Sequence, residues 1–331
     1  MVIGADALEE ASRAMPTPTD KKPIIAVAGP TASGKTALSV FLAERIDAEI
    51  VNFDSVQIYR GIEIATAKPT AEERRGIPHH LIDYVDPNID YTAADWARDA
   101  EEKIREIESR NKRVVLVGGT GFYLRTLCRP LFESPRTDPE LRERFRRLHS
   151  EHGPEYLHAM LARLDPEAAK KLPVRDHVRV IRALEVIEQT GNRISELQSD
   201  RPEPPELAAR ISLVVLSPPR DILYDKINTR TLAHFDAGLV DEVKGLLASG
   251  VRENGNALGA HAYRRVCEYL RGERSLESAI ERSQQDVRNY AKRQLTWFRK
   301  EQGAKWFDGF GDEPILAADV LEYAKMPNYK G

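Results

Sequence analysis

An apolar run that leads into a glycine-rich phosphate-binding motif constrains this chain more than any other feature. Residues 24–28 read IIAVA, and the next residues complete the pattern G-x-x-x-x-G-K-[ST]: Gly29, Pro30, Thr31, Ala32, Ser33, Gly34, Lys35 and Thr36. In such a loop the backbone N–H groups point at phosphate oxygens, and the following helix N-terminus adds a positive dipole end. Lys35 adds an ammonium group, and Thr36 a hydroxyl for Mg²⁺. The motif predicts a site for a phosphorylated ligand.

Strand and helix patterns alternate after this motif. We expect a helix with Ala37, Leu38, Phe41 and Leu42 on one apolar face, then a strand over 48–53 that ends at Asp54. A capping box at 92–95 opens a second helix, and the apolar run 114–117 then ends in Gly118-Gly119-Thr120. Residues 211–216 again read as a strand, and the remainder reads as helical. This order predicts an α/β fold with a parallel sheet flanked by helices.

Length and composition predict two domains. The chain has 331 residues, of which 41% are hydrophobic and 31% charged. Residues 134–205 lack strand-like runs, so we interpret them as an all-helical insertion in a core formed by 23–133 and 206–331. Residues 1–22 are expected to be a flexible extension, neither signal peptide nor membrane span. Two distant cysteines argue against a disulfide framework or a zinc module. We expect a monomeric, cytoplasmic protein.

Basic residues gather locally although the net charge is −3. Residues 288–300 contain five basic side chains and no acidic one, and the segments 142–147 and 175–182 are rich in arginine. Each segment could be a solvated helix face. Separate basic strips on an acidic protein nevertheless favour a folded RNA as partner.

The ends of the predicted strands carry the candidate chemistry. A phosphoryl-transferring enzyme with this loop needs an acidic residue after an apolar strand, but the strand 114–117 ends in glycines. Asp54 is the well-placed carboxylate, and it could be a metal ligand, a general base or a helix cap. Thr120 offers an accessible hydroxyl or is a turn residue. His79 and His80 lack a third metal ligand, so we interpret them as structural or substrate-lining.

Together these motifs resemble the bacterial tRNA dimethylallyltransferase family over nearly the whole chain. The resemblance rests on the phosphate loop and on six further segments, 54–60 (DSVQIYR), 66–69 (TAKP), 78–83 (PHHLID), 117–120 (VGGT), 182–186 (RALEV) and 291–299 (AKRQLTWFR). It implies a phosphate-loop nucleotide-kinase-like core. It also implies transfer of a dimethylallyl group from dimethylallyl diphosphate to N6 of the adenosine 3′ to the anticodon, in tRNAs that read codons beginning with U.

The resemblance also assigns roles. Asp54 would be the general base, whereas Lys35, Thr36 with Mg²⁺, Thr120 and Arg230 would stabilise the departing diphosphate. The adenosine would be flipped into a channel, where the segment of Asp54, Ser55, Val56 and Gln57 would recognise it. The helical insertion would bind the anticodon stem-loop. The further RNA contacts are implied for Arg142, Val178, Arg179, Val180, Ile181, Arg182, Gly259, Ala260, His261, Ala262, Tyr263, Arg264, Lys292, Arg293, Gln294, Trp297 and Arg299.

The chain departs from the family pattern where Ala65 and Ala262 replace the usual glycines. At a positive φ, alanine would be strained by about 1 kcal/mol. Three other functions share features with this sequence: a phosphate-loop kinase of small molecules, an isopentenyltransferase that uses AMP, and a non-enzymatic RNA-binding protein. The long insertion and the basic strips favour an RNA acceptor over a mononucleotide.

Overall fold

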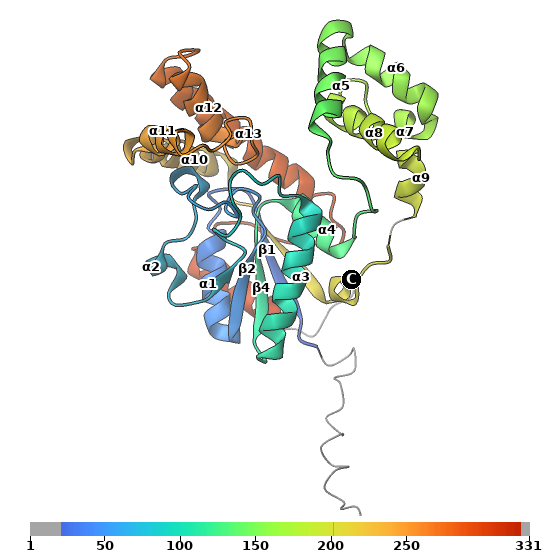
Figure 1. Ribbon diagram of the computed structural model, residues 1–331. Coiled ribbons are helices and arrows are strands. Elements are labelled where there is room, and N and C mark those ends of the chain that lie inside the picture. The colour runs from blue at the N-terminus through green and yellow to red at the C-terminus, as the bar shows by residue number, and fades with distance from the viewer. Residues whose placement is uncertain (1–20, 201, 326–331) are drawn as a thin grey trace, which may run out of the picture. The chain divides into compact units, whose positions relative to one another are not determined.

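Two compact units make up the computed structural model, which describes residues 21–200 and 202–325 (Figure 1). The first unit combines the chain up to Cys128 with the chain from Pro205 onward, and the second is Arg129–Pro204. The sequence pattern placed the start of the helical unit at position 134, and the structure places it a few residues earlier, at Arg129. Apart from Lys21 and Lys22, the expected N-terminal extension lies outside the described residues.

A six-stranded, wholly parallel sheet forms the centre of the first unit, with the order β3-β2-β4-β1-β5-β6. The strands are β1 (Ile24–Ala28), β2 (Ala48–Asn52), β3 (His79–His80), β4 (Arg113–Gly118), β5 (Ile211–Leu216) and β6 (Lys305–Phe307). The four longer strands and the α/β fold confirm the sequence prediction. The expectation of a helical remainder was wrong at β6, since a strand of three residues at a sheet edge is too short to show a pattern.

Helices cover both faces of the sheet, which explains the continuous apolar strands. α1 (Lys35–Ile46) and α14 (Pro314–Lys325) pack on one face through Leu38, Leu42 and Val320. α3 (Ala93–Ser109) and α4 (Gly121–Cys128) lie on the other face, where Trp96 is buried and donates from Nε1 to the Asn52 carbonyl at 2.9 Å. Ala37, which we expected on the apolar face of α1, is exposed.

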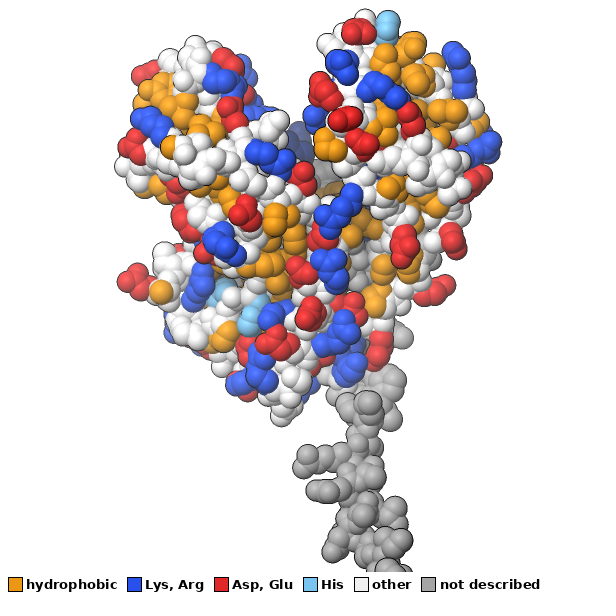
Figure 2. Space-filling model, in the orientation of Figure 1, with side chains coloured by type: hydrophobic (Ala, Val, Ile, Leu, Met, Phe, Trp, Pro, Cys, Tyr) orange, Lys and Arg blue, Asp and Glu red, His pale blue; other side chains and the backbone are white. Residues whose placement is uncertain are grey.

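The remaining elements of this unit lie beside the carboxyl ends of the strands or connect them. They are η3 (Ile64–Thr66), α2 (Ala71–Arg74), η4 (Glu206–Arg210), α10 (Arg220–Asp236), α11 (Leu239–Ala248), α12 (His261–Leu270) and α13 (Leu276–Phe298). α13 packs against both α10 and α12. None of the helices within the described ranges has the length and apolar character needed to cross a membrane. On the face drawn in Figure 2, acidic and basic side chains are interspersed.

The second unit is all-helical, as its proline and glycine punctuation predicted. Its helices are α5 (Pro139–His152), α6 (Pro154–Leu164), α7 (Pro166–Lys171), α8 (His177–Thr190) and α9 (Ile194–Ser199). A fully buried carboxylate, Glu185, lies in its core. Arg142 donates to Glu185 at 2.6 and 2.9 Å, and Arg182 donates at 3.3 Å. These two arginines therefore neutralise a buried charge, which a solvated basic strip would not do.

Replacing Arg142 by methionine tests this role. The variant leaves Glu185 with only the longer bond from Arg182, so we expect the opening free energy of α5 and α8 to fall by about 2–3 kcal/mol. Amide hydrogen exchange in these helices measures it. Arg144→Met is the matched control, because Arg144 pairs with the exposed Glu188 and should cost under about 1 kcal/mol. Equal losses in the two variants would contradict the role given to Glu185.

Candidate active site

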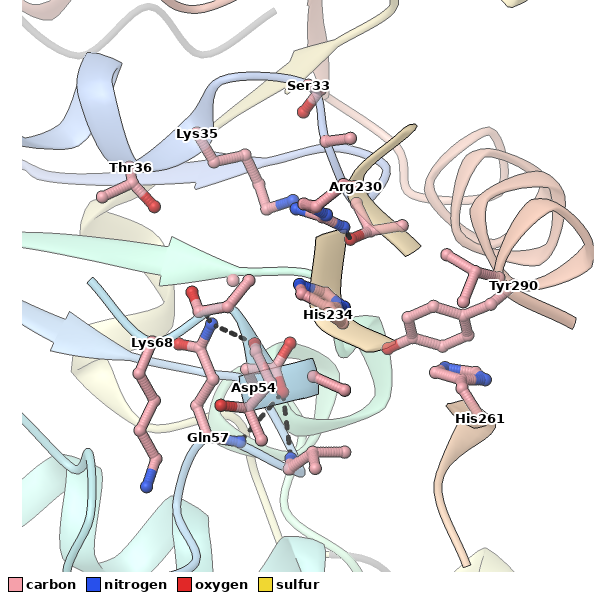
Figure 3. Close-up of a pocket in the computed structure, with 18 of the residues that line it drawn as sticks. Ser33, Lys35, Thr36, Asp54, Gln57, Lys68, Arg230, His234, His261 and Tyr290 are labelled. Atoms are coloured by element: carbon pink, nitrogen blue, oxygen red, sulfur yellow. Dashed lines mark hydrogen bonds between the residues drawn. The ribbon is translucent and has the colours of Figure 1, made fainter. Parts of the chain in front are cut away.

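A cavity of about 540 Å³ lies at the carboxyl ends of the central strands. Its wall includes the phosphate loop, Asp54 after β2, Arg230 and His234 from α10, and Tyr290 from α13 (Figure 3). This is the edge where an open parallel sheet places its ligands. The structure thus brings Lys35, Thr36, Asp54 and Arg230 to one cavity. Thr120 lies on the turn after β4, where its hydroxyl contacts Ser55 and does not line the cavity wall.

The phosphate loop has the backbone that its motif requires. Gly34 has φ 82° and precedes the first residue of α1, Lys35, whose Nζ donates to the Pro30 carbonyl at 2.7 Å. A Cβ on Gly34 would lie 2.8 Å from the backbone nitrogen of Gly311. Gly311 in turn donates to the Ser33 carbonyl at 2.9 Å. A segment from the far end of the chain therefore supports the loop from behind, and only glycine fits at both positions.

Cationic groups meet at one side of the cavity. Lys35 and Arg230 point toward one another in Figure 3, and Arg230 donates to the hydroxyl of Thr31. Desolvation lowers the pKa of Lys35 to about 8, although Asp54 raises it in part, and Arg230 lowers it further. Burial also lowers the pKa of Arg230, against the attraction of Asp54. An anion bound between these cations would relieve both their desolvation and their mutual repulsion.

Asp54 lies across the cavity from the two cations and closes a local turn. Its Oδ1 accepts the N–H groups of Val56 at 2.9 Å and of Gln57 at 3.2 Å. Asp54 therefore caps a turn and not the helix that was one of its predicted roles, since the next helical element is η3 at Ile64–Thr66. The cap uses a single oxygen; for Oδ2 the described residues provide no hydrogen bond. Thr120 holds the next residue, since its hydroxyl accepts the Ser55 N–H at 3.0 Å. A base role and a cap role are compatible in this arrangement.

The ring of Tyr290 and the imidazoles of His234 and His261 complete the wall, and only His261 among these three was predicted from the sequence. The ring of Tyr290 lies 4.3 Å from that of His261. Burial lowers the pKa of His261 to about 4, and burial with the nearby Arg230 does the same for His234, so both imidazoles are neutral at pH 7. Burial raises the pKa of the Tyr290 phenol. Tyr290 lies one turn before Gln294 on α13, so the helical spacing could have identified it.

The predicted RNA-contact residues fall into three groups. Lys292, Arg293 and Trp297 line a second cavity of about 440 Å³ along α13. Arg299 is also exposed near the end of this helix, whereas Gln294 is buried and faces the first cavity.

On α8 the expected contact segment is only partly accessible. Val178 is 67% exposed, whereas Val180 and Ile181 are 1% and 4% exposed and belong to the apolar core of their unit. Arg179 pairs with Asp176 on the first turn. The expectation that Val180 and Ile181 offer side chains to RNA was wrong, because their helical positions face inward.

The segment 259–264 also differs from the expectation. Ala260, His261, Ala262 and Tyr263 all line the first cavity, although Ala262 and Tyr263 are almost fully buried, and Arg264 is exposed. Ala262 lies inside α12 and Ala65 in η3, and neither has a positive φ, so the strain that we considered does not arise. The segments that contain Ala65 and Ala262 instead contact each other, because the hydroxyl of Tyr263, the residue after Ala262, accepts the Ala65 N–H at 3.0 Å.

The chain is similar to proteins of known activity over most of its length. The family model described as IPP transferase matches residues 57–301. The tRNA dimethylallyltransferase of Koribacter versatilis is 46% identical over 297 residues, covering 90% of this chain and 96% of that protein. The tRNA dimethylallyltransferase of Geobacter metallireducens is 45% identical over 306 residues, covering 92% and 98% of the two chains.

Solved structures agree with these relatives. The full-length tRNA isopentenylpyrophosphate transferase of Bacillus halodurans superposes with a TM-score of 0.67 at 37% identity, covering 92% of this chain and 95% of that one. A eukaryotic dimethylallyltransferase acting on tRNA superposes with a TM-score of 0.73 at 26% identity, covering 92% and 76%.

The pKa of Lys35 makes anion binding dependent on pH. With a pKa of about 8 in the free protein, the ammonium form is lost as the pH rises above that value. We expect inorganic pyrophosphate to bind about tenfold more weakly at pH 9 than at pH 7, with proton uptake on binding near pH 8. Calorimetry in two buffers of different ionisation enthalpy measures both quantities. Lys35→Met controls for the ionisation of pyrophosphate itself, and an equal pH ratio in this variant would contradict the assignment.

Proposed function

Because the chain belongs to the IPP transferase family, we propose that it transfers a dimethylallyl group from dimethylallyl diphosphate to N6 of the adenosine 3′ to the anticodon of tRNA. The observation that carries the proposal is the pairing of a cationic phosphate loop with Asp54 across one cavity. A leaving diphosphate needs the cationic phosphate loop, and an incoming amine needs the carboxylate of Asp54. The tRNAs concerned would be those that read codons beginning with U.

The reaction needs a base because an exocyclic amine of adenine is a weak nucleophile, its lone pair being delocalised into the ring. As N6 attacks carbon 1 of the donor, the N–C bond forms, the C–O bond breaks, and diphosphate leaves with the bonding electrons. The free Oδ2 of Asp54 takes the amine proton while Oδ1 stays in its turn. Lys35, Arg230 and the loop N–H groups stabilise the charge that grows on the diphosphate.

Magnesium would assist the leaving group. Thr36 lines the cavity beside Lys35, and its hydroxyl is the group with which this motif binds Mg²⁺. Within the described ranges, no three acidic, histidine or cysteine side chains are grouped so as to hold a metal. The ion would therefore take most of its ligands from phosphate oxygens and water, which is usual for Mg²⁺. When bound, it neutralises negative charge on the diphosphate.

The RNA would bind outside this cavity. The groove of Lys292, Arg293, Trp297 and Lys300 offers ammonium and guanidinium groups for phosphates and an indole ring for a base. We assign the anticodon stem-loop to this groove and to the exposed face of the helical unit. The target adenosine would leave its stack to reach Asp54. Such a protein would act as a monomer in the cytoplasm.

The rival acceptor is free AMP. The purified protein is incubated with Mg²⁺ and radiolabelled dimethylallyl diphosphate, and with unmodified tRNA, AMP or no acceptor in parallel. We expect label on tRNA alone, and nuclease digestion should place it on a single adenosine. Label on AMP without label on tRNA would overturn the proposal. Transfer of phosphate from ATP to a small molecule would favour a kinase.

The structure separates the two roles of Asp54. In Asp54→Asn the side-chain oxygen can still accept the N–H groups of Val56 and Gln57, but the amide cannot take a proton. We expect kcat to fall by about 10²–10⁴-fold with tRNA affinity unchanged. Asp54→Ala loses the turn as well and serves as the comparison. Turnover near the native value in Asp54→Asn would remove Asp54 from the base role.

The groove on α13 predicts a salt effect. Replacing Lys292 and Lys300 together by alanine removes two exposed cations, so tRNA should bind more weakly at low salt and with a slope of log Kd against log[salt] reduced by about 1.5–2. Filter binding over a range of KCl measures the slope. Lys244→Ala combined with Lys325→Ala is the control, because both lysines lie on other helices and pair with carboxylates. If both double variants have the same slope, the basic residues of α13 form a solvated helix face and not an RNA-binding groove.

A further inference from the structure

The side chain of Gln294 joins two loops that border the reaction cavity. Its Oε1 accepts the N–H of Thr31 at 2.9 Å, and its Nε2 donates to the carbonyl of Gly119 at 3.1 Å. Gln294 is 4% exposed. Thr31 belongs to the phosphate loop after β1, and Gly119 to the turn after β4, the strand paired with β1. A single buried amide therefore sets the separation of the two loops.

Close packing reinforces these bonds. A Cβ on Gly119 would lie 2.0 Å from Nε2 of Gln294, and a Cβ on Gly121 would lie 2.2 Å from the ring of Trp297. Neither distance occurs between real atoms, so a Cβ at either position would force the side chain of Gln294 or Trp297 to move. Gln294 and Trp297 thus dock one helix on Gly119 and Gly121.

The two joined loops serve the two substrates. On the donor side, the hydroxyl of Thr31 also accepts from Arg230, so this residue is held at both its N–H and its side chain. On the acceptor side, Thr120 holds the N–H of Ser55, the neighbour of Asp54. A shift of Gln294 would therefore move the diphosphate site and the base in relation to each other.

The same helix also borders the proposed RNA groove. Lys292, Arg293 and Trp297 line that groove, within one turn of Gln294. We propose that Gln294 is a positioning residue that ties α13 to the phosphate loop and to the Gly119–Thr120 turn, so that RNA binding and diphosphate binding are energetically coupled. This inference rests on the proposed function for the identity of the RNA. Coupling of this kind is reciprocal, so each ligand tightens the other by the same factor.

Gln294→Met tests the proposal, because methionine keeps the length of the side chain and loses both hydrogen bonds. Gln285→Met is the matched control: Gln285 is exposed on the same helix, and among the described residues its bonds are to Asn289 and Arg288. The measurements are tRNA Kd with and without Mg²⁺-pyrophosphate, and kcat and KM for transfer.

In the native protein and in Gln285→Met we expect pyrophosphate to tighten tRNA binding about fivefold or more. In Gln294→Met this factor should fall to about one, with tRNA Kd in the absence of pyrophosphate within about twofold of native. We expect kcat to drop by about 10–100-fold, as misplaced reacting groups do. Absence of coupling in the native protein, or native coupling in Gln294→Met, would overturn the proposal.

A second set of variants protects the test against misfolding. Gly119→Ala should lower the melting temperature through its collision with Gln294, and Gln294→Ala should remove that collision. We expect Gly119→Ala to cost less in the Gln294→Ala background than alone, while kcat of the double variant stays at the level of Gln294→Ala. An equal cost in both backgrounds would show that the contact does not hold the turn and would overturn the proposal.

The two levels of inference can fail separately. Transfer to tRNA by the native protein with equal kcat in Gln294→Met and Gln285→Met overturns the role of Gln294 alone. Absence of transfer to tRNA in the native protein overturns the proposed function. In that case pyrophosphate binding still tests the positioning role of Gln294. Gln294→Met should weaken this binding several-fold relative to Gln285→Met.

Discussion

β4 pairs in parallel with β1 on one side and with β2 on the other, and this pairing places the loops that border the cavity side by side. Ala28 is paired with Gly118, and Asn52 on β2 with Val117, so three strands end at one level of the sheet. The residues that follow them are the phosphate loop, the turn with Thr120 and the segment that begins at Asp54. Because the strands are buried on both faces, their register is fixed by apolar packing. The cavity thus inherits its geometry from the core.

Much of this arrangement follows from local sequence. The run IIAVA before a complete phosphate-loop motif fixes a strand, a loop and a helix start, and a capping box fixes the start of α3. Asp54 and Thr120 could be predicted to face the loop because strand ends of a parallel sheet share one edge. Their bonds to the backbone at Val56 and Ser55 could not, since they depend on turns of a few residues.

Other features depend on which face of a helix is buried. Periodicity placed Ala37 inward, and it is exposed, whereas the family resemblance gave Val180 and Ile181 to RNA, and both lie in the core. Likewise a count of arginines cannot reveal that Arg142 and Arg182 share the buried Glu185. Such pairings join segments far apart in sequence, so a pattern read along the chain has no signal for them. His234 was missed for the same reason, whereas the spacing of Tyr290 one helical turn before Gln294 was a signal that could have been used.

The support behind the phosphate loop has a consequence for biosynthesis. The loop lies near the start of the chain, yet Thr31 is held by Gln294, 263 positions later, and Ser33 by Gly311. Contacts of such long sequence separation form late in folding because loop closure must precede them. During translation the motif therefore leaves the ribosome long before its supports are made. An incomplete chain would carry the motif without the shape that binds a diphosphate, and nascent fragments would not compete for the donor.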